Sequence, residues 1–392
     1  MLRRHPIAWI VVAQLLGTSL WFSANAAADD LMRLWALNAA DIGRLTNAVQ
    51  IGFIAGTLVF AFSGVADRFA ASRIFAVCAS VGALFNAAFA WWAPDLDSAW
   101  WLRLGVGLSM AGVYPVGMKL IVSWSPQKAS QSLGLLVGML ILGSALPHGL
   151  RALGASWPWT AVVSASSLLA LIGAAAIAHI GDGPHLRRQA GAPGPKLGAL
   201  AAFGVARFRA SALGYFGHMW ELYAFWTLSP LLVGAVLARA DLASPTLVSA
   251  GAFAVMGIGA LGSIGGGWWA QRIGGARVAF VALAGSGLMC LVFPWIASAW
   301  PVALAGLALL VWGVLVVADS AQFSAMSMQA CPPQWVGSAI TLQNSLGFLI
   351  TTAAIAWTTS AWPSWGPEVA WLLLPGPLFG LWGMRRLLRR EA

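Results

Sequence analysis

Long apolar segments, interrupted by short polar ones, run along nearly the whole chain. One helical crossing of a bilayer core requires about 20 consecutive apolar residues, and segments of this kind recur from Pro6 to the C-terminus. Charges, glycine and proline clusters or tryptophans bound them. They predict twelve transmembrane helices, at residues 6–28, 42–64, 74–94, 100–124, 133–153, 159–180, 210–236, 247–269, 278–296, 302–328, 335–357 and 368–384.

The composition excludes an ordinary soluble protein. Of 392 residues, 60% are hydrophobic and 9% are charged, and the mean hydropathy is +0.80. Cys78, Cys290 and Cys331 lie in or beside apolar segments, without the spacing of a disulfide framework or a zinc site. The N-terminus also resembles a signal peptide, but its apolar segment is longer than such peptides need, so we expect it to form the first helix. We expect no cofactor and no metal site.

The basic residues concentrate on one side of the predicted helices. With both termini in the cytoplasm, 16 of the 22 basic residues fall inside, and only Arg33, Arg44, Arg151 and Arg239 fall outside. The net charge of +10 thus reflects membrane topology, and we exclude a nucleic-acid partner. We predict a multi-pass protein of a bacterial cytoplasmic (inner) membrane, with the lipid bilayer around it and both termini cytoplasmic, that functions as a monomer.

One polar segment divides the chain near its middle. Residues 181–196 are rich in proline and glycine, basic, and free of apolar periodicity, which is typical of a flexible linker. We therefore predict an N-terminal six-helix bundle at residues 1–180, a cytoplasmic linker at 181–206 and a C-terminal six-helix bundle at 207–392.

The two halves resemble each other. The second predicted helix is followed by the sequence SGVADRFAASR, from Ser63 to Arg73, and the eighth contains and precedes GWWAQRIGGAR, from Gly267 to Arg277. Both arginines of the second copy, Arg272 and Arg277, lie 204 positions after those of the first, Arg68 and Arg73. Such internal repeats are common in transporters, with the substrate site between the repeats.

These two segments resemble the G-x-L-A-D-R-x-G-R-R motif of the major facilitator superfamily. The resemblance implies an all-α polytopic membrane fold of 12 transmembrane helices in two pseudo-symmetric six-helix halves. It also implies a gating role for six residues, which are Asp67, Arg68, Arg73, Gln271, Arg272 and Arg277. Topology alone would explain the arginines but not Asp67. The sequence departs from the motif at Ser63, Ala70 and Gln271.

Six ionisable residues fall inside predicted helices, where they are costly unless paired or facing a cavity. They are Arg103, Lys119, His148, His218, Glu221 and Asp319. In the family the first, fourth, seventh and tenth helices line the central cavity, and five of these six residues lie on the fourth, seventh and tenth. They are therefore functional candidates, but Lys119 lies close enough to the cytoplasmic end of its helix to reach the membrane surface, and His148 follows Pro147, where we expect a kink with a histidine at the membrane interface.

The fourth predicted helix runs from Arg103 through Tyr114-Pro115 to Trp124 and Pro126. This pattern resembles the organic-anion symporters and the cyanate and nitrate/nitrite permeases of the superfamily. The resemblance implies that Arg103 contacts an anionic substrate, with Tyr114 nearby, because a guanidinium presents a planar set of donors to an oxyanion. The glutamate of those proteins is Met110 here. An ion pair of Arg103 with Asp29, Asp30 or Asp41 is the alternative.

Two carboxylates remain to carry a proton, Asp319 and Glu221. Asp319 and Gln322 are three residues apart on one helix, as are His218 and Glu221 on another, so each pair shares a helix face. A carboxylate removed from water can bind and release a proton near neutral pH. We expect proton coupling at Asp319 and Glu221, with His218, Gln322 and Gln343 in substrate binding. A permanent network of hydrogen bonds between helices is the alternative.

The sequence thus favours a secondary transporter that couples a small organic or inorganic anion to protons by alternating access. Proton-driven efflux of amphipathic, drug-like compounds is an alternative within the same class. A polytopic receptor or membrane enzyme is an alternative from another class. No nucleophile motif, metal-ligand spacing or phosphate-binding glycine loop accompanies the buried polar residues, so we predict that the protein is not an enzyme.

Overall fold

The structure is a computed structural model that describes residues 5–154, 156–186, 198–332 and 335–388, except for the side chains of residues 66–67, 129–130 and 198–199. In these ranges the regular secondary structure is entirely helical. The chain forms two compact units, Met1–Gly194 and Pro195–Ala392.

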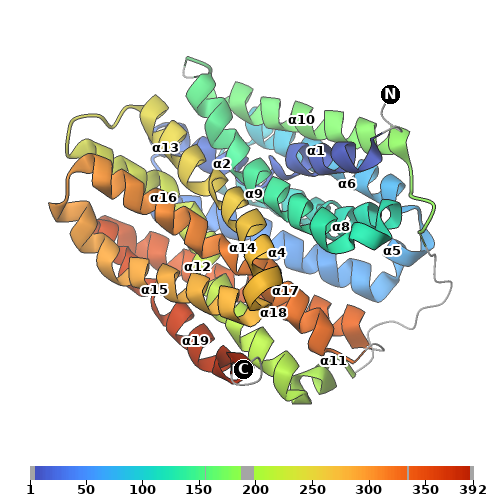
Figure 1. Cartoon of the computed structure of the whole chain (residues 1–392). Helices are drawn as coiled ribbons and strands as arrows, with labels where there is room; N and C mark the ends of the chain where they lie inside the picture. The colour runs from blue at the N-terminus through green and yellow to red at the C-terminus, as the bar shows by residue number, and fades with distance from the viewer. Residues whose placement is uncertain (1–4, 155, 187–197, 333–334, 389–392) are drawn as a thin grey trace. The chain divides into compact units, whose positions relative to one another are not determined.

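The N-terminal unit contains six predicted membrane crossings, of which the first and the fourth are built from two helices (Figure 1). Its helices are α1 (Pro6–Thr18), α2 (Ser23–Ala26), α3 (Ala28–Leu34), α4 (Ala39–Ser63), α5 (Val65–Arg68), α6 (Ala71–Trp92), α7 (Leu96–Met110), α8 (Tyr114–Trp124), η2 (Pro126–Lys128), α9 (Ala129–Leu153) and α10 (Trp159–Ile180). Helix α4 packs against α7, and α6 packs against α10.

The C-terminal unit repeats this plan. Its helices are α11 (Gly198–Ala201), η3 (Ala202–Gly204), α12 (Ala206–Ala238), α13 (Pro245–Gly257), α14 (Gly259–Ile273), α15 (Gly275–Ala299), α16 (Val302–Ala318), α17 (Ser320–Ala330), α18 (Val336–Trp365), η5 (Gly366–Leu372) and α19 (Pro375–Leu388). Helix α12 packs against α18 and α19, and α14 packs against α16.

Ten helical segments of the described chain are long and apolar enough to cross a membrane. One of them, Val336–Leu388, has 53 residues and contains both α18 and α19, which correspond to two predicted crossings. The first predicted crossing corresponds to the shorter apolar helix α1 followed by α2. Large apolar side chains such as Leu84, Leu168 and Leu261 are more than half exposed, as expected where helices face lipid.

Four predicted crossings, expected as continuous helices, are interrupted in the structure. The breaks lie between α1 and α2, α7 and α8, α13 and α14, and α16 and α17. Between α7 and α8, Gly112 and Val113 donate their N–H groups three residues back, to Ser109 and Met110, and the new helix begins at Tyr114 with Pro115 in its first turn. A proline lacks an N–H donor, so it suits a helix start.

Close backbone contacts recur in both units at a constant spacing. A methyl group on Gly107 would lie 2.1 Å from the carbonyl oxygen of Val49, and one on Gly313 would lie 2.0 Å from that of Val255, 206 positions later in each case. Gly56 and Gly262 meet the carbonyls of Leu108 and Val314 in the same way. Glycine is therefore required where α4 crosses α7 and where α13 and α14, the counterparts of α4, cross α16.

The glycine contacts repeat after 206 residues, whereas the arginine motifs repeat after 204. The difference arises because the N-terminal unit has an extra turn between the glycine contact and the motif. Helix α4 ends at Gly64, in the left-handed conformation at φ 66°, and α5 follows it, whereas α14 continues to Ile273. The N-terminal unit thus has two more residues than the C-terminal unit between the glycine contact and the motif.

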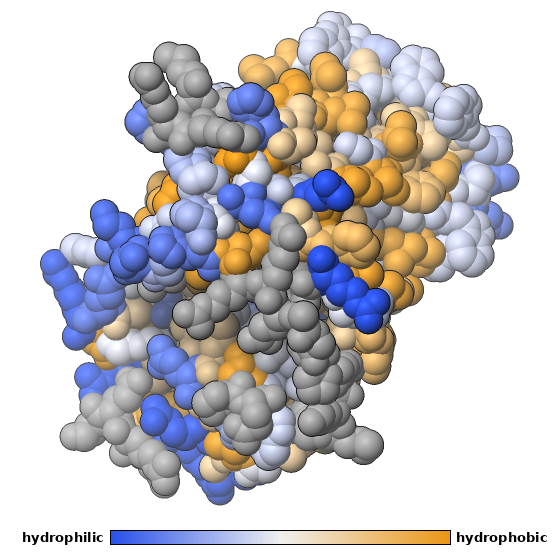
Figure 2. Space-filling model, turned by 90° about the vertical axis from the view of Figure 1, so that its right-hand side faces the viewer, coloured by the Kyte–Doolittle hydropathy of each residue, from blue (hydrophilic) through white to orange (hydrophobic). Residues whose placement is uncertain are grey.

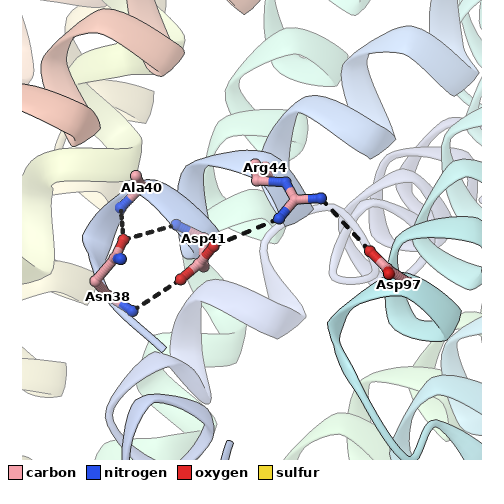
Figure 3. Close-up of polar contacts among 5 residues, drawn as sticks. All are labelled: Asn38, Ala40, Asp41, Arg44 and Asp97. Carbon is pink, nitrogen blue, oxygen red and sulfur yellow. Dashed lines mark hydrogen bonds and ion pairs between the residues drawn. The ribbon is translucent and has the colours of Figure 1, made fainter. Parts of the chain in front are cut away.

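One end of α4 is fixed by a local network of polar contacts (Figure 3). The Asn38 side chain accepts from the N–H groups of Ala40 and Asp41, and Asp41 accepts from the Asn38 N–H, which forms a capping box. Arg44 then lies 3.6 Å from Asp41 and 3.5 Å from Asp97 in the first turn of α7. Since these charges are largely exposed, we assign them a positioning effect rather than much stability.

The neighbouring start of α7 has its own capping box. Asp95 accepts hydrogen bonds from the hydroxyl and the N–H of Ser98, at 2.6 and 2.9 Å. These bonds hold the pKa of Asp95 below its usual range, because they stabilise the carboxylate. The start of the fourth crossing is therefore defined by its own side chains.

Candidate functional site

Arg103 is completely buried on α7, and the surrounding helices provide its partners. Its Nη1 donates to Ser23 Oγ at 3.0 Å and to Asn86 Oδ1 at 2.7 Å, and its Nη2 donates to the carbonyls of Leu20 and Trp21 at 3.0 and 2.6 Å. Those two carbonyls lie in the turn between α1 and α2. The guanidinium thus stabilises the break in the first crossing by binding backbone groups that the turn leaves without helical partners.

Asn86 extends these contacts, which together we name the Arg103 cluster (Arg103, Ser23, Asn86 and the carbonyls of Leu20 and Trp21). Its amide nitrogen donates to the Val163 carbonyl and to Ser167 Oγ, both at 3.0 Å, on α10. Ser23 Oγ donates to Asn86 Oδ1 at 2.6 Å. The cluster therefore links the first, third, fourth and sixth crossings of the N-terminal unit.

The Arg103 cluster uses four of the five guanidinium N–H groups, and Nε is buried without a hydrogen-bond partner. All four acceptors are neutral. Among the described residues, no carboxylate pairs with Arg103; Asp30 pairs with Arg33 and Arg151, and Asp41 with Arg44. The expected alternative of an ion pair between Arg103 and one of these acids is therefore not present, and the buried cation keeps its net charge.

In the C-terminal unit, Glu221 on α12 is the centre of a second buried cluster. Its Oε1 accepts from Trp312 Nε1 at 2.8 Å, from Cys290 Sγ at 3.3 Å and from the Ser286 hydroxyl. Trp312 Nε1 also lies 3.1 Å from Ser286 Oγ. We name these four residues the Glu221 cluster; it links α12 to α15 and α16.

His218 lies one helical turn before Glu221 and contacts a different helix. Its Nδ1 lies 2.8 Å from Asp319 Oδ1, and its Nε2 lies 2.7 Å from Ser320 Oγ. His218 and Asp319 are 2% and 1% exposed, so both ionisable groups are removed from water, whereas Ser320 is half-buried. Asp319 sits at the break between α16 and α17, and we name Ser320, His218 and Asp319 the His218 chain.

The other predicted substrate residues are more scattered. Gln322 is buried on α17, with Oε1 close to Gly275 at the start of α15 rather than in the His218 chain. Gln343 is buried on α18, with Oε1 lacking a hydrogen-bond partner. Tyr114 is half-buried at the start of α8. Within the C-terminal unit the structure therefore brings together His218 and Asp319, with Glu221 nearby, and gives Gln322 and Gln343 other surroundings.

The predicted gating residues lie at helix ends. Arg68, Arg73, Gln271, Arg272 and Arg277 are exposed, at the ends of α5 and α14 and the starts of α6 and α15, and the side chain of Asp67 lies outside the described part. Arg272 stacks on Trp268, 4.1 Å from the ring centroid. In the space-filling view of Figure 2, hydrophilic residues (blue) gather on the face that carries α5 in Figure 1.

Several polar residues of these clusters were not among the predicted site residues. Ser23, Asn86, Ser286, Cys290 and Trp312 give no distinctive sequence signal, because single polar residues of this type are common in apolar helices. Asp182 accepts from the N–H of Ser72 at 2.8 Å, at the start of α6, next to the gating motif. The sequence did contain one indication of a role for Asp182, because it is an acidic residue between two glycines, in Gly181-Asp182-Gly183, just after the end of a predicted helix.

The helices and buried polar clusters define a class, that of multi-pass membrane transporters built from two similar helical units. The sequence profile described as Major Facilitator Superfamily matches residues 10–380. The chain therefore belongs to the major facilitator superfamily, and it is a transporter rather than an enzyme. No curated protein sequence matches the chain.

Solved structures of similar fold include three transporters. The nucleoside transporter NupG is 13% identical, with a TM-score of 0.71, covering 98% of each chain. A bacterial homologue of the human lysosomal transporter Spinster is 13% identical, with a TM-score of 0.68, covering 100% of this chain and 94% of that one. A D-xylose–proton symporter is 12% identical, with a TM-score of 0.76, covering 97% and 95%. At these identities the similarity concerns the fold alone.

Proposed function

We propose that this transporter moves a small organic or inorganic anion together with protons by alternating access. The proposal depends on one observation, the opposite charge of the buried groups in the two units. The N-terminal unit buries the Arg103 guanidinium among neutral acceptors, and the C-terminal unit buries the carboxyls of Glu221 and Asp319. A buried cation without a counter-ion favours an anion nearby, and a buried carboxyl is favoured by a bound proton.

The roles we assign follow from these contacts. Arg103 attracts the anion through its net charge and its unused Nε–H, with Tyr114, His218, Gln322 and Gln343 as further substrate-binding candidates. Asp319 and Glu221 are the candidate carriers of the proton. Asp67, Arg68, Arg73, Gln271, Arg272 and Arg277 form the gate. One structure of similar fold is a proton symporter, which is compatible with this assignment.

The proposal extends to the setting of the protein. The bundles at residues 1–180 and 207–392, joined by a cytoplasmic linker at 181–206, act as the moving parts of a monomer in a bacterial inner membrane. The fourth crossing, from Arg103 to Trp124, supports the relation to the anion symporter and the cyanate and nitrate/nitrite permease branches of the family.

Transport by the purified full-length protein in proteoliposomes tests the proposal. We expect saturable uptake of at least one of cyanate, nitrite, nitrate, formate or acetate, increased by an inward proton gradient and reduced at least about tenfold by Arg103→Ala. Arg44→Ala, which removes an exposed arginine, is the matched control. Flux that ignores the proton gradient and is unaltered by Arg103→Ala contradicts the proposal. Proton-driven transport of amphipathic dyes in place of anions overturns the anion assignment in favour of efflux.

A further inference from the structure

We infer that the two buried carboxyls of the C-terminal unit have different tasks: Ser320, His218 and Asp319 form a proton relay that ends at Asp319, whereas Glu221 is a positioning residue that does not exchange the transported proton. The inference rests on the proton coupling proposed above and assigns it to one of two carboxyls. Asp319 and Glu221 contact different kinds of neighbours, and this difference supports the two assignments.

The contacts of Glu221 are those of a fixed structural element. Three donors from two other helices converge on Oε1, namely Ser286 and Cys290 on α15 and Trp312 on α16. Trp312 is completely buried, and its ring lies 4.6 Å from that of Phe225 and 5.4 Å from that of Phe293, centroid to centroid. Exchange of a proton at Glu221 would have to disturb this packed aromatic group, for which the interior of the unit leaves little freedom.

The contacts of Asp319 are those of a group that can change its protonation state. It lies at the break between α16 and α17, where the N–H groups of Gln322 and Phe323 both bind its backbone carbonyl. Its side chain contacts His218 Nδ1 at 2.8 Å, and the opposite ring nitrogen reaches Ser320 Oγ at 2.7 Å. Since Ser320 is half-buried, the chain leads from a partly accessible hydroxyl to a fully buried acid.

The order of these atoms permits a balanced proton transfer. In the starting state neutral His218 carries its proton on Nδ1, 2.8 Å from Asp319 Oδ1, and Nε2 accepts from the Ser320 hydroxyl. An incoming proton binds Ser320 Oγ as the hydroxyl proton moves to Nε2 and the Nδ1 proton moves to Asp319 Oδ1. The serine is restored, the histidine has changed tautomer and the net gain is one proton on Asp319.

Few other titratable groups lie on the helices packed against α17. These helices are α12, α14, α15, α16 and α18. In their described parts, α16 and α18 carry no ionisable side chain, and the others carry Arg207, Arg209, Tyr215, His218, Glu221, Tyr223, Arg272, Arg277 and Cys290. Of these, His218 contacts Asp319 directly, Glu221 acts on Asp319 as a nearby group of the same charge, and the Tyr215 ring lies 6.2 Å from that of His218. A titration of the relay therefore involves Asp319 and His218 directly, and residue-specific carbon-13 labelling together with the Glu221→Gln variant separates it from that of Glu221.

Infrared spectroscopy of the full-length protein in membranes tests the assignment without a known substrate. Protonated carboxyls have a resolved C=O absorption, and carbon-13 labelling of aspartate or glutamate carboxyls tells the two residue types apart in the unmutated protein. We expect the absorption that changes with pH to shift on aspartate labelling and to disappear in Asp319→Asn, and to persist in Glu221→Gln. A pH-dependent band that shifts on glutamate labelling and is lost in Glu221→Gln overturns the inference.

The relay itself is tested by the rate of proton uptake after a pH jump, followed with an indicator dye. Ser320→Ala should slow proton uptake by at least about tenfold, because it removes the entry group of a proton transfer. Ser324→Ala is the matched control, since its hydroxyl binds the Ser320 carbonyl, one turn along the same helix. Equal rates in Ser320→Ala and the unmutated protein overturn the relay. If the band belongs to Asp319 but flux ignores the proton gradient, the relay stands and the proposed coupling fails.

Discussion

At the scale of single residues, the buried ionisable groups of Arg103 and Glu221 act mainly through hydrogen bonds to helices other than their own. Arg103 reaches three segments with one guanidinium, and Glu221 collects three donors on one oxygen. Breaking one partner of such a buried set leaves the remaining groups unsatisfied, which costs more than the bond itself contributes. Both residues should therefore influence stability as well as transport.

Arg103→Lys keeps the charge but not the geometry. A lysine has a single ammonium on a flexible stem and cannot reach Asn86, Ser23 and the two carbonyls of the turn together. We expect the free energy of unfolding to fall by about 2–4 kcal/mol, measured by denaturant unfolding in detergent micelles. The control is Arg73→Lys, at an exposed position, which should have no measurable effect. Equal stability of the two variants would mean that the cluster is not a structural element.

Trp312 and Glu221 should be energetically coupled. Trp312→Phe keeps an aromatic ring but removes the Nε1 donor to Glu221 and Ser286. In a double-mutant cycle with Glu221→Leu, which has no acceptor, we expect a coupling of about 1–3 kcal/mol, because each single variant already breaks the shared bond. Trp300→Phe, at a half-exposed ring, provides the control pair, with coupling close to zero. Strict additivity of the first pair would contradict the Glu221 cluster.

At the scale of the helices, glycines set the distance between neighbours. The pairs α4 with α7 and α14 with α16 approach so closely that a single methyl group would meet a carbonyl oxygen. The breaks in four crossings are the other feature of this scale. Each exposes backbone groups inside a membrane, and the structure supplies side chains for them, as Arg103 does for the carbonyls of Leu20 and Trp21.

Gly313→Ala and Gly107→Ala should both separate their helix pairs. We expect each to lower the free energy of unfolding by about 1–3 kcal/mol, since the added Cβ would lie 2.0 or 2.1 Å from a backbone oxygen. Gly306→Ala, on the same helix as Gly313 but with no atom within 4 Å of the new Cβ, should be neutral or stabilising by up to about 1 kcal/mol. If all three behave alike, helix propensity and not packing explains the effect.

At the scale of the whole molecule, the duplication organises the sequence, and the two copies differ in charge. The glycine contacts of the two units repeat at 206 positions, while the buried ionisable centre is a guanidinium in one unit and carboxyls in the other. Substrate charge and proton binding can then be handled by different units. The positions of the basic residues predict the orientation of each unit in the membrane.

The labelling of single cysteines tests the prediction that both termini are cytoplasmic. In a variant in which Cys78, Cys290 and Cys331 are replaced by serine, His185→Cys should react with a membrane-impermeant thiol reagent only in inverted vesicles. Asp97→Cys should react in intact cells, because it follows an outer loop, and its native side chain is 87% exposed. Labelling of both from the same side would contradict the predicted topology.

Much of this architecture could be derived from the chain alone. A membrane helix requires a long apolar segment, and basic residues concentrate at the cytoplasmic ends of such helices. The helices and the internal repeat can therefore be recognised from the order of residues in the sequence. The motif from Ser63 to Arg73 and its copy identified the family, which the profile over residues 10–380 confirms. Arg103, His218, Glu221 and Asp319 were recognisable as well, because a charge inside an apolar segment is rare.

The partners of those residues were decided only by tertiary structure. Asn86, Ser286 and Trp312 look ordinary in the sequence, and they matter because helix packing brings them to Arg103 and Glu221 from 17, 65 and 91 residues away. The interruption at Leu20 and Trp21 was hidden for the same reason, since the residue that compensates it lies on another helix. An apolar pattern records which residues avoid water, but a hydrogen bond between helices depends on how two distant segments meet, and that geometry has no linear signature.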